Sequence, residues 1–193
     1  DVLDGNAGTD TIKINNAGDA STGGAGAAKV VVDFDLVTEF EKIVVTDANG
    51  STTAADYIKI ELSGSVTTAN TPATFEVDAS AITDADDDLV FNYDADNTAV
   101  TNSALTTKFT IKGGAGDDTI YGATGADTIT TGSGANVVVT GAGGGTVTGG
   151  SGIDNVTGGA GIDTISTAGG ADIISAAAGN DIIDGGSGAD VIT

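Results

Sequence analysis

The chain has 193 residues, 28 acidic and six basic side chains, a net charge of −22, and no His, Cys, Met or Trp. This charge argues against nucleic acid as a partner, and no apolar run approaches the roughly 20 residues that span a bilayer, so we expect no membrane insertion. Without His or Cys, serine triads, cysteine nucleophiles and ordinary zinc sites are excluded. Because the sequence contains no Met, we expect it to be part of a longer chain.

Residues 1–31 predict a partial, degenerate repeat tract. The segment Gly5–Lys13 is a nonapeptide, GNAGTDTIK, in which Asp10 precedes Ile12 by two residues. A second copy, GGAGAAKVV, spans Gly23–Val31 but has Ala28 in place of the Asp. Both copies are in register with a longer repeat tract at the other end of the chain.

Residues 32–112 predict a β-rich segment and no helix. Seven of the eight aromatic residues lie between Phe34 and Phe109, which indicates a thicker core than in the flanking tracts. We expect an irregular solenoid or a sandwich-like insert. The expected strands, the first of which begins just before this segment, are Lys29–Leu36, Phe40–Thr46, Tyr57–Leu62, Thr74–Asp78, Leu89–Tyr93 and Lys108–Ile111.

An acidic cluster lies inside this segment, at Asp84 and Asp86–Asp88. Its spacing begins like an EF-hand loop, but Leu89 stands where that loop needs Gly and Ala95 where it needs Glu. The pattern therefore favours a solvated loop over an additional calcium site.

Residues 113–193 consist of nine tandem nonapeptides. Position four is Gly in all nine, position eight is Ile or Val in all nine, and position six is Asp in seven. A β-branched residue every nine positions predicts a short strand with one side chain pointing inward. Gly at a fixed position predicts a tight turn. All six Lys precede residue 113, and nine Asp follow it.

Two nonapeptides make one coil of a parallel β-roll, so the Asp side chains of successive coils stack at roughly 4.8 Å. Two bare carboxylates at that separation repel by about 3 kcal/mol at an effective dielectric near 20. A calcium ion between them would turn this repulsion into attraction and couple metal binding to folding. The alternative, Asp as a solubilising turn residue, does not account for seven acids at one position.

The pattern GGxGxDxUx, in which U is a large apolar residue, resembles the calcium-binding repeat of the RTX (repeats-in-toxin) family, and GGAGIDTIS and GGSGADVIT match it throughout. The resemblance implies several Ca²⁺ ions, each between repeat n and repeat n+2. Complete carboxylate pairs are then Asp154–Asp172, Asp172–Asp190 and Asp163–Asp181, whereas Asn136 offers only a neutral oxygen and Gly145 offers none, so sites there should be weaker or empty. The implied metal ligands are Asp10, Asp118, Asp127, Asn136, Asp154, Asp163, Asp172, Asp181 and Asp190.

The segments Val37–Asp47, Asp78–Asp84 and Lys108–Ile120 resemble RTX-type bacterial surface-layer proteins. This resemblance implies a non-enzymatic structural protein that leaves the cell by type I secretion, is located outside the cell on the bacterial surface and self-associates into a lattice. A cell-surface glycan is a further expected partner. The alternatives are a rod-like spacer of a large RTX adhesin or fibre and a non-catalytic RTX module of a secreted enzyme. Ice binding by a Thr row is disfavoured, because Tyr121, Val139 and Asp184 interrupt position nine.

Overall fold

The computed structural model describes residues 3–4, 10–16, 30–33, 37–38, 41–47, 56–61, 74–83, 85, 87–92 and 107–193. Every regular element in these stretches is a strand, and none of them contains a helix that could cross a membrane. The strands that precede residue 113 are β1 (Leu3–Asp4), β2 (Thr11–Asn16), β3 (Val30–Asp33), β4 (Val37–Thr38), β5 (Lys42–Asp47), β6 (Asp56–Glu61), β7 (Thr74–Asp78), β8 (Asp87–Asn92) and β9 (Lys108–Lys112). Those that follow are β10 (Thr119–Tyr121), β11 (Asp127–Thr130), β12 (Val137–Val139), β13 (Gly145–Thr148), β14 (Asn155–Thr157), β15 (Thr164–Ser166), β16 (Ile173–Ser175), β17 (Ile182–Asp184) and β18 (Val191–Ile192).

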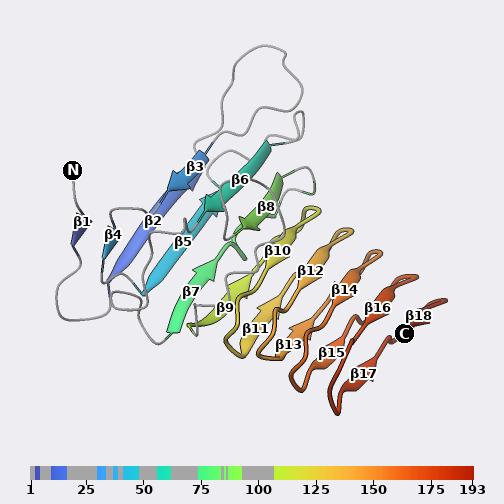
Figure 1. Cartoon of the computed structure of the whole chain (residues 1–193). Helices are drawn as coiled ribbons and strands as arrows, with labels where there is room; N and C mark the ends of the chain where they lie inside the picture. Colours follow the sequence, from blue (N-terminus) through green and yellow to red (C-terminus); the bar gives the residue numbers. More distant parts are fainter. Residues whose placement is uncertain are drawn as a thin grey trace.

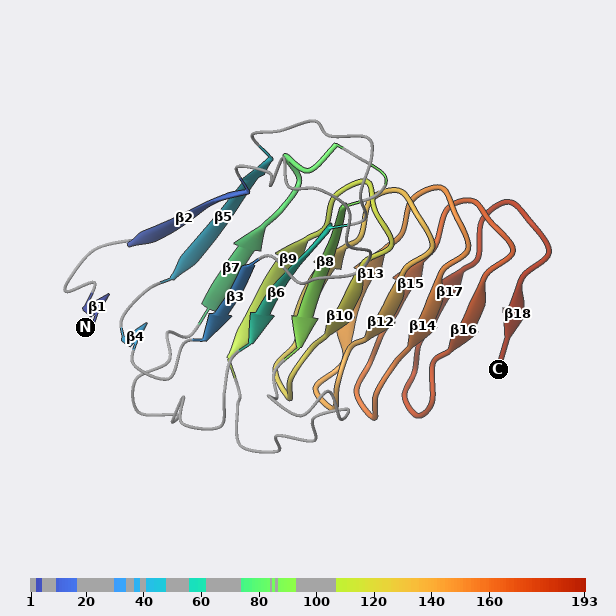
Figure 2. The same ribbon diagram turned by 90° about the horizontal axis from the view of Figure 1, so that it is seen from above.

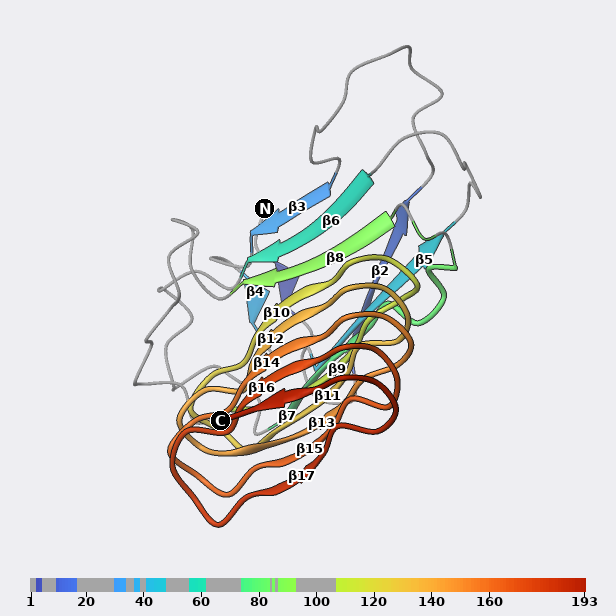
Figure 3. The same cartoon turned by 90° about the vertical axis from the view of Figure 1, so that its right-hand side faces the viewer.

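The strands form two parallel sheets that face each other along a rod (Figure 1). Sheet I has the order β3-β6-β8-β10-β12-β14-β16-β18, sheet II has the order β2-β5-β7-β9-β11-β13-β15-β17, and β1 pairs with β4. Viewed from the C-terminal end, successive coils lie over one another as flattened loops (Figure 3). The predicted all-β parallel roll is confirmed.

In the nonapeptide part, odd-numbered repeats supply the strands of sheet I and even-numbered repeats supply those of sheet II. Position-eight side chains point into the space between the sheets, and from Ile120 to Ile174 each is at most 1% exposed. Position-seven side chains lie on the outer faces, as the exposed Thr146 and Thr164 show. One Ile or Val per repeat therefore builds a core that is a single layer thick.

The coils before residue 113 are wider and belong to the same two sheets. Lys42 and Glu76 are neighbours across strands although they are 34 residues apart, whereas the nonapeptide coils repeat after 18. Their core contains a ring cluster in which Phe109 packs edge-on against Phe91 at 5.3 Å and Phe75 at 6.2 Å. Because β9 pairs with both β7 and β11, the wide coils continue directly into the repeats (Figure 2). The insert is thus an irregular solenoid and not a sandwich.

The six strands expected between residues 29 and 111 correspond to β3 and β5–β9, and β7 has the expected bounds. The others differ by a few residues at their ends, where turn residues such as Asp56 and Asp87 continue the pairing. In the degenerate copy at 23–31 only Val30 and Val31 are described, and Ala28 lies outside the described residues. The sheets show no break at residue 113, and the division of the chain at residues 31 and 112 stays a prediction.

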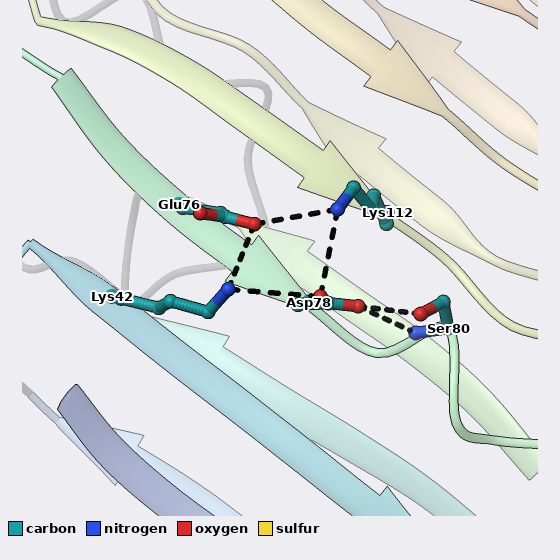
Figure 4. Close-up of polar contacts among 5 residues, drawn as sticks. All are labelled: Lys42, Glu76, Asp78, Ser80 and Lys112. Atoms are coloured by element: carbon teal, nitrogen blue, oxygen red, sulfur yellow. Dashed lines mark hydrogen bonds and ion pairs between the residues drawn. The ribbon is translucent and has the colours of Figure 1, made fainter.

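Four charged side chains form a network on the outer face of sheet II, across β5, β7 and β9 (Figure 4). Lys42 Nζ lies 3.0 Å from Glu76 Oε1, and Lys112 Nζ lies 3.4 Å from Glu76 Oε1 and 3.5 Å from Asp78 Oδ2. Hydrogen bonds from Ser80 lower the pKa of Asp78. Alternating charges on neighbouring strands fix their register, although such exposed pairs contribute little individually.

The turns between repeats bring successive backbones too close for most side chains. Gly152 has φ +136°, and a Cβ on it would overlap the carbonyl oxygen of Gly134 in the preceding coil. Ala168 and Ala177 occupy the left-handed region, at φ +67° and +66°, where L-residues are strained. In repeats two to nine, position four is Gly because a Cβ there would overlap the backbone of the preceding coil.

We expect Gly152→Ala to destabilise the calcium-loaded chain by about 2–4 kcal/mol, because it adds both backbone strain and overlap. Gly169→Ala is the matched control, since its new Cβ would meet only Ser187, with Oγ at 3.2 Å and the carbonyl oxygen at 4.0 Å. Urea denaturation in calcium compares the two variants. Equal losses of stability would contradict this account of the turn.

Candidate metal sites

The position-six residues of the odd repeats stack into a column, the odd ladder, beside the start of each sheet I strand. Each side chain accepts a hydrogen bond from the backbone N–H of the residue at the corresponding place one coil earlier. These bonds run from Leu89 to Asp118 Oδ1 (2.8 Å), Asp118 to Asn136 Oδ1 (2.9 Å), Asn136 to Asp154 Oδ1 (3.2 Å), Asp154 to Asp172 Oδ1 (2.9 Å) and Asp172 to Asp190 Oδ1 (3.0 Å). The structure therefore brings all five odd-repeat positions into one line.

The even repeats form a second column, the even ladder, beside sheet II. The N–H of Phe109 donates to Asp127 Oδ1 at 2.8 Å, that of Gly145 to Asp163 Oδ1 at 2.7 Å, and that of Asp163 to Asp181 Oδ1 at 2.9 Å. Gly145 has no side chain and interrupts the column. The carboxylate pairs that the resemblance implies, n with n+2, are thus neighbours in the two ladders.

Two of these carboxylates contain a buried oxygen that lacks a well-formed hydrogen bond within the protein. Asp172 is 0% exposed and its Oδ2 atom lacks a hydrogen bond. Asp154 is 1% exposed and its Oδ2 atom has no hydrogen bond of good geometry, although the Gly150 N–H lies near enough to act on the pKa of this carboxyl. A buried anionic oxygen without a partner is costly, and a second carboxylate in the next coil adds repulsion. A divalent cation between the coils would offset both costs, so these residues fit calcium.

Backbone carbonyls supply further oxygen atoms at the same place. A Cβ on Gly158 would lie 2.7 Å from Asp163 Oδ2 and 2.7 Å from the carbonyl oxygen of Ala176, one coil further on. At Gly149 the corresponding atoms are Asp154 Oδ2 and the Thr167 carbonyl oxygen. No three acidic, His or Cys side chains of the described stretches converge, so a cation here would combine one or two carboxylates with carbonyls. Such a set of hard oxygen atoms suits calcium and excludes softer metals.

Burial also shifts the pKa values of the ladder carboxyls. It raises the pKa of Asp118 to about 7 and that of Asp127 to about 6, although backbone N–H groups of Leu89 and Phe109 act in the opposite direction. Burial likewise raises the pKa of Asp154, and the charge of Asp172 adds to the increase. Without metal, the folded chain therefore holds protons that the unfolded chain releases.

We expect the calcium-free chain to lose stability as pH rises from about 4 to 7. An unfolded Asp ionises near its usual pKa of 3.8, whereas folded Asp118 stays protonated until about pH 7, so the unfolded state is favoured increasingly in between. The loss is on the order of 1.4 kcal/mol for each unit of pKa shift. Thermal melts in chelator at pH 5 and pH 8 measure it. An Asp118→Asn/Asp127→Asn variant should melt at more nearly equal temperatures, and an unchanged pH dependence in it would contradict the assignment.

One carboxylate pair was not foreseen from the sequence. Asp10, in the first nonapeptide, donates its N–H to Glu41 Oε2 at 2.8 Å, the same bond that links the even ladder, and the Oδ2 atom of Asp10 is buried without a partner. Glu41 precedes Ile43 by two residues, as Asp10 precedes Ile12, and this acid-x-Ile spacing is the signal that could have identified it. The 31-residue separation hides the pair from a search with the 18-residue period.

The acidic cluster after residue 83 is only partly described. Asp84 and Asp86 lie outside the described residues, and of Asp87 only the strand position is described. Asp88 Oδ1 accepts the N–H of Asp117 at 2.8 Å. Asp117 is at position five of the first repeat, so Asp88 lies at the corresponding place one coil earlier. Its expected role as a solvated loop stays a prediction.

The model for the RTX calcium-binding nonapeptide repeat matches the chain four times, over residues 1–13, 112–147, 148–183 and 166–193. The first match contains Asp10, and the other three cover the repeats that form both ladders. No curated protein and no solved structure shows significant similarity to the chain. Repeat pattern, parallel roll and family match agree, and the chain is an RTX calcium-binding repeat protein.

Proposed function

We propose that the chain is a calcium-dependent structural protein of the bacterial cell surface, without catalytic activity, that assembles into a surface-layer lattice after export. In this function the RTX turns bind several Ca²⁺ ions outside the cell. The folded rod then associates with further copies of itself, and a cell-surface glycan anchors the lattice.

The observation that carries the proposal is the pair of buried oxygen atoms on Asp154 and Asp172 that lack a well-formed hydrogen bond. They make the folded state unfavourable where calcium is scarce and favourable where it is abundant. The net charge of −22 acts in the same direction, because self-repulsion expands a chain that has no bound cations. RTX repeats are typical of secreted proteins, and calcium is abundant outside the cell.

The rod itself supports a structural role. Two continuous parallel sheets run from β2 and β3 to β17 and β18, so every coil is braced by the coils on either side. Such solenoids gain stability by stacking neighbours and provide long, regular outer faces for lateral contacts. The same property suits a spacer in an adhesin or fibre, and self-association distinguishes the two functions.

Small-angle scattering during a calcium titration through the millimolar range tests the proposal, with magnesium at equal ionic strength as the control. We expect a chain that is at least partly expanded without calcium, becomes a compact rod over a narrow calcium interval and then forms ordered sheets visible by electron microscopy. A rod that stays monomeric at all concentrations would favour the spacer function. A scattering curve that calcium leaves unchanged would contradict calcium-dependent folding itself.

A further inference from the structure

The two ladders differ between their first and second halves. In residues 107–193, which the structure describes without a gap, a position-six carboxylate has another one directly before or after it in its ladder only among repeats five to nine. These neighbours are Asp154, Asp172 and Asp190 in the odd ladder and Asp163 and Asp181 in the even ladder. Repeats one to four contain Asp118, Asp127, Asn136 and Gly145 at this position, and no two carboxylates are consecutive there.

The carboxylates of the first two repeats accept a backbone N–H on each oxygen, as Asp163 in the sixth repeat also does. Asp118 accepts the N–H of Leu89 at 2.8 Å with Oδ1 and that of Gly114 at 3.1 Å with Oδ2. Asp127 accepts the N–H groups of Phe109 and Ala123 at 2.8 and 2.9 Å, one on each oxygen. Leu89 and Phe109 belong to the wide coils, so both contacts attach the first repeats to a hydrophobic core and not to another acid.

In the third repeat an amide occupies the place between two carboxylates. Asn136 Oδ1 accepts the N–H of Asp118, and Asn136 Nδ2 donates to Asp154 Oδ1 at 2.9 Å. The side chain thus presents an acceptor to the coil before it and a donor to the coil after it. An Asp at this position would offer acceptors in both directions and would need a cation to face Asp154.

In the fourth repeat a hydroxyl has the corresponding role. Thr140, at position one, is fully buried and donates from Oγ1 to Asp163 Oδ1 at 3.2 Å. Gly145 leaves the space for it, because a Cβ at Gly145 would lie 3.2 Å from both Cβ and Cγ2 of Thr140. In this repeat the Thr140 hydroxyl thus faces Asp163 where Gly145 supplies no side chain. By contrast, Thr167, at position one of the seventh repeat, donates to the Gly185 carbonyl oxygen.

We propose that calcium dependence begins only after the fourth repeat: residues 113–148, in which no two ladder carboxylates are consecutive, stack on the wide coils without metal. Residues 149–193 fold onto this preformed end when calcium binds, and Asn136 and Thr140 then present donors to the first ladder carboxylates of that part, Asp154 and Asp163. The inference rests on calcium binding by the later repeats. A metal-free end gives the calcium-dependent part a template, so that its first coil need not nucleate alone. It also fixes the direction of folding, from residue 149 towards residue 193.

Hydrogen exchange of the full chain, read by mass spectrometry in chelator and in saturating calcium, tests the proposal. In chelator we expect amides of β10–β13 to keep their protection and those of β14–β18 to exchange at least about tenfold faster than in calcium. If both halves lost protection together in chelator and regained it in calcium, the boundary would be refuted while calcium-dependent folding stood. If calcium changed neither half, the proposed function itself would fail.

Asn136→Asp sharpens the test, because it makes the odd ladder continuous from Asp118 to Asp190. We expect this variant to bind additional calcium by equilibrium titration and to lose protection of β10 and β12 in chelator. Asn155→Asp is the matched control, since it makes the same change at an exposed position outside the ladder. Thr140→Val, which removes the donor to Asp163 without changing the shape, should raise the calcium concentration at which β15 becomes protected. An Asn136→Asp variant with unaltered calcium stoichiometry would overturn the role given to Asn136.

Discussion

Replacing Asp172 by Asn is expected to weaken calcium binding at two sites at once. Asp172 is the ladder residue with a carboxylate on both sides, Asp154 before it and Asp190 after it, and its own Oδ2 atom is buried without a partner. Asn keeps the hydrogen bond from the Asp154 N–H but removes the negative charge. We expect the affinity at each of the two pairs to fall on the order of tenfold, or about 1.4 kcal/mol per site.

Without calcium, the same substitution should not destabilise the chain. Asp172 adds to the raised pKa of Asp154, which shows that the two charges repel in the folded state. Removing one of them relieves that repulsion, so Asp172→Asn should melt at the same temperature as the parent chain in chelator, or higher. A loss of stability in calcium without a loss in chelator separates a metal ligand from a residue that only supports the fold, because loss of a merely structural group destabilises the chain under both conditions.

Calcium titrations followed by circular dichroism, and thermal melts in chelator and in calcium, measure both effects. Asp184→Asn is the matched control, since Asp184 is an exposed acid at position nine whose contact, with the N–H of Gly186, an Asn can retain. It should change neither quantity appreciably. If Asp172→Asn left the calcium midpoint where Asp184→Asn leaves it, the odd ladder would not be the calcium site.

The period of the sequence made the roll and its two ladders predictable. One Ile or Val every nine residues with Gly four residues earlier allows only a narrow range of backbone paths, and the pairing of residues 18 apart follows from two repeats per coil. Phe91, Phe109 and the other large core residues were recognisable as a thicker core. The sequence did not show that these residues lie in the same two sheets as the repeats, because coils of about 30 residues have no constant repeat length.

For the two ladder positions without Asp, the sequence predicted only that a carboxylate is missing. Asn136 and Gly145 departed visibly from the pattern, but the sequence does not show that the amide donates to Asp154 or that Thr140 fills the space at Gly145. These contacts depend on side-chain positions one coil apart. Metal binding stays a prediction for all nine ladder and repeat residues: Asp10, Asp118, Asp127, Asn136, Asp154, Asp163, Asp172, Asp181 and Asp190.

The pattern of residues on the outer faces could be interpreted only once the fold was known. Position nine looked interrupted when the repeats were taken consecutively, because consecutive repeats alternate between the sheets. On sheet II alone, Thr128, Thr146 and Thr164 of position seven lie in register on adjacent strands. Position nine of the same sheet continues from Thr130 and Thr148 to Ser166. A pattern of exposed residues on a solenoid thus has meaning only after odd and even repeats are separated.

Phe109→Ala is expected to have the largest effect on the calcium-free chain. The ring is 1% exposed and makes edge-on contacts with Phe75 and Phe91, and the backbone N–H of Phe109 donates to Asp127 Oδ1, the first carboxylate of the even ladder. Truncating a buried Phe costs about 3–5 kcal/mol, which is a large part of the total stability of a domain. The wide coils would lose the core on which the first repeats stack.

The consequence should depend on calcium. In chelator, no bound metal compensates for the lost core, so Phe109→Ala should abolish the protection of β7–β13 from hydrogen exchange. In saturating calcium, binding at the later repeats adds stability by mass action, and β14–β18 should keep their protection while β7–β9 stay weakened. Tyr121→Ala is the control, because it truncates a half-buried aromatic residue on the outer face of sheet I. If the two variants behaved alike, the ring cluster would not be the support of the calcium-free roll. If calcium fully restored β7–β9 in Phe109→Ala, the two halves would be one cooperative unit, and the wide coils would not fold independently of the metal.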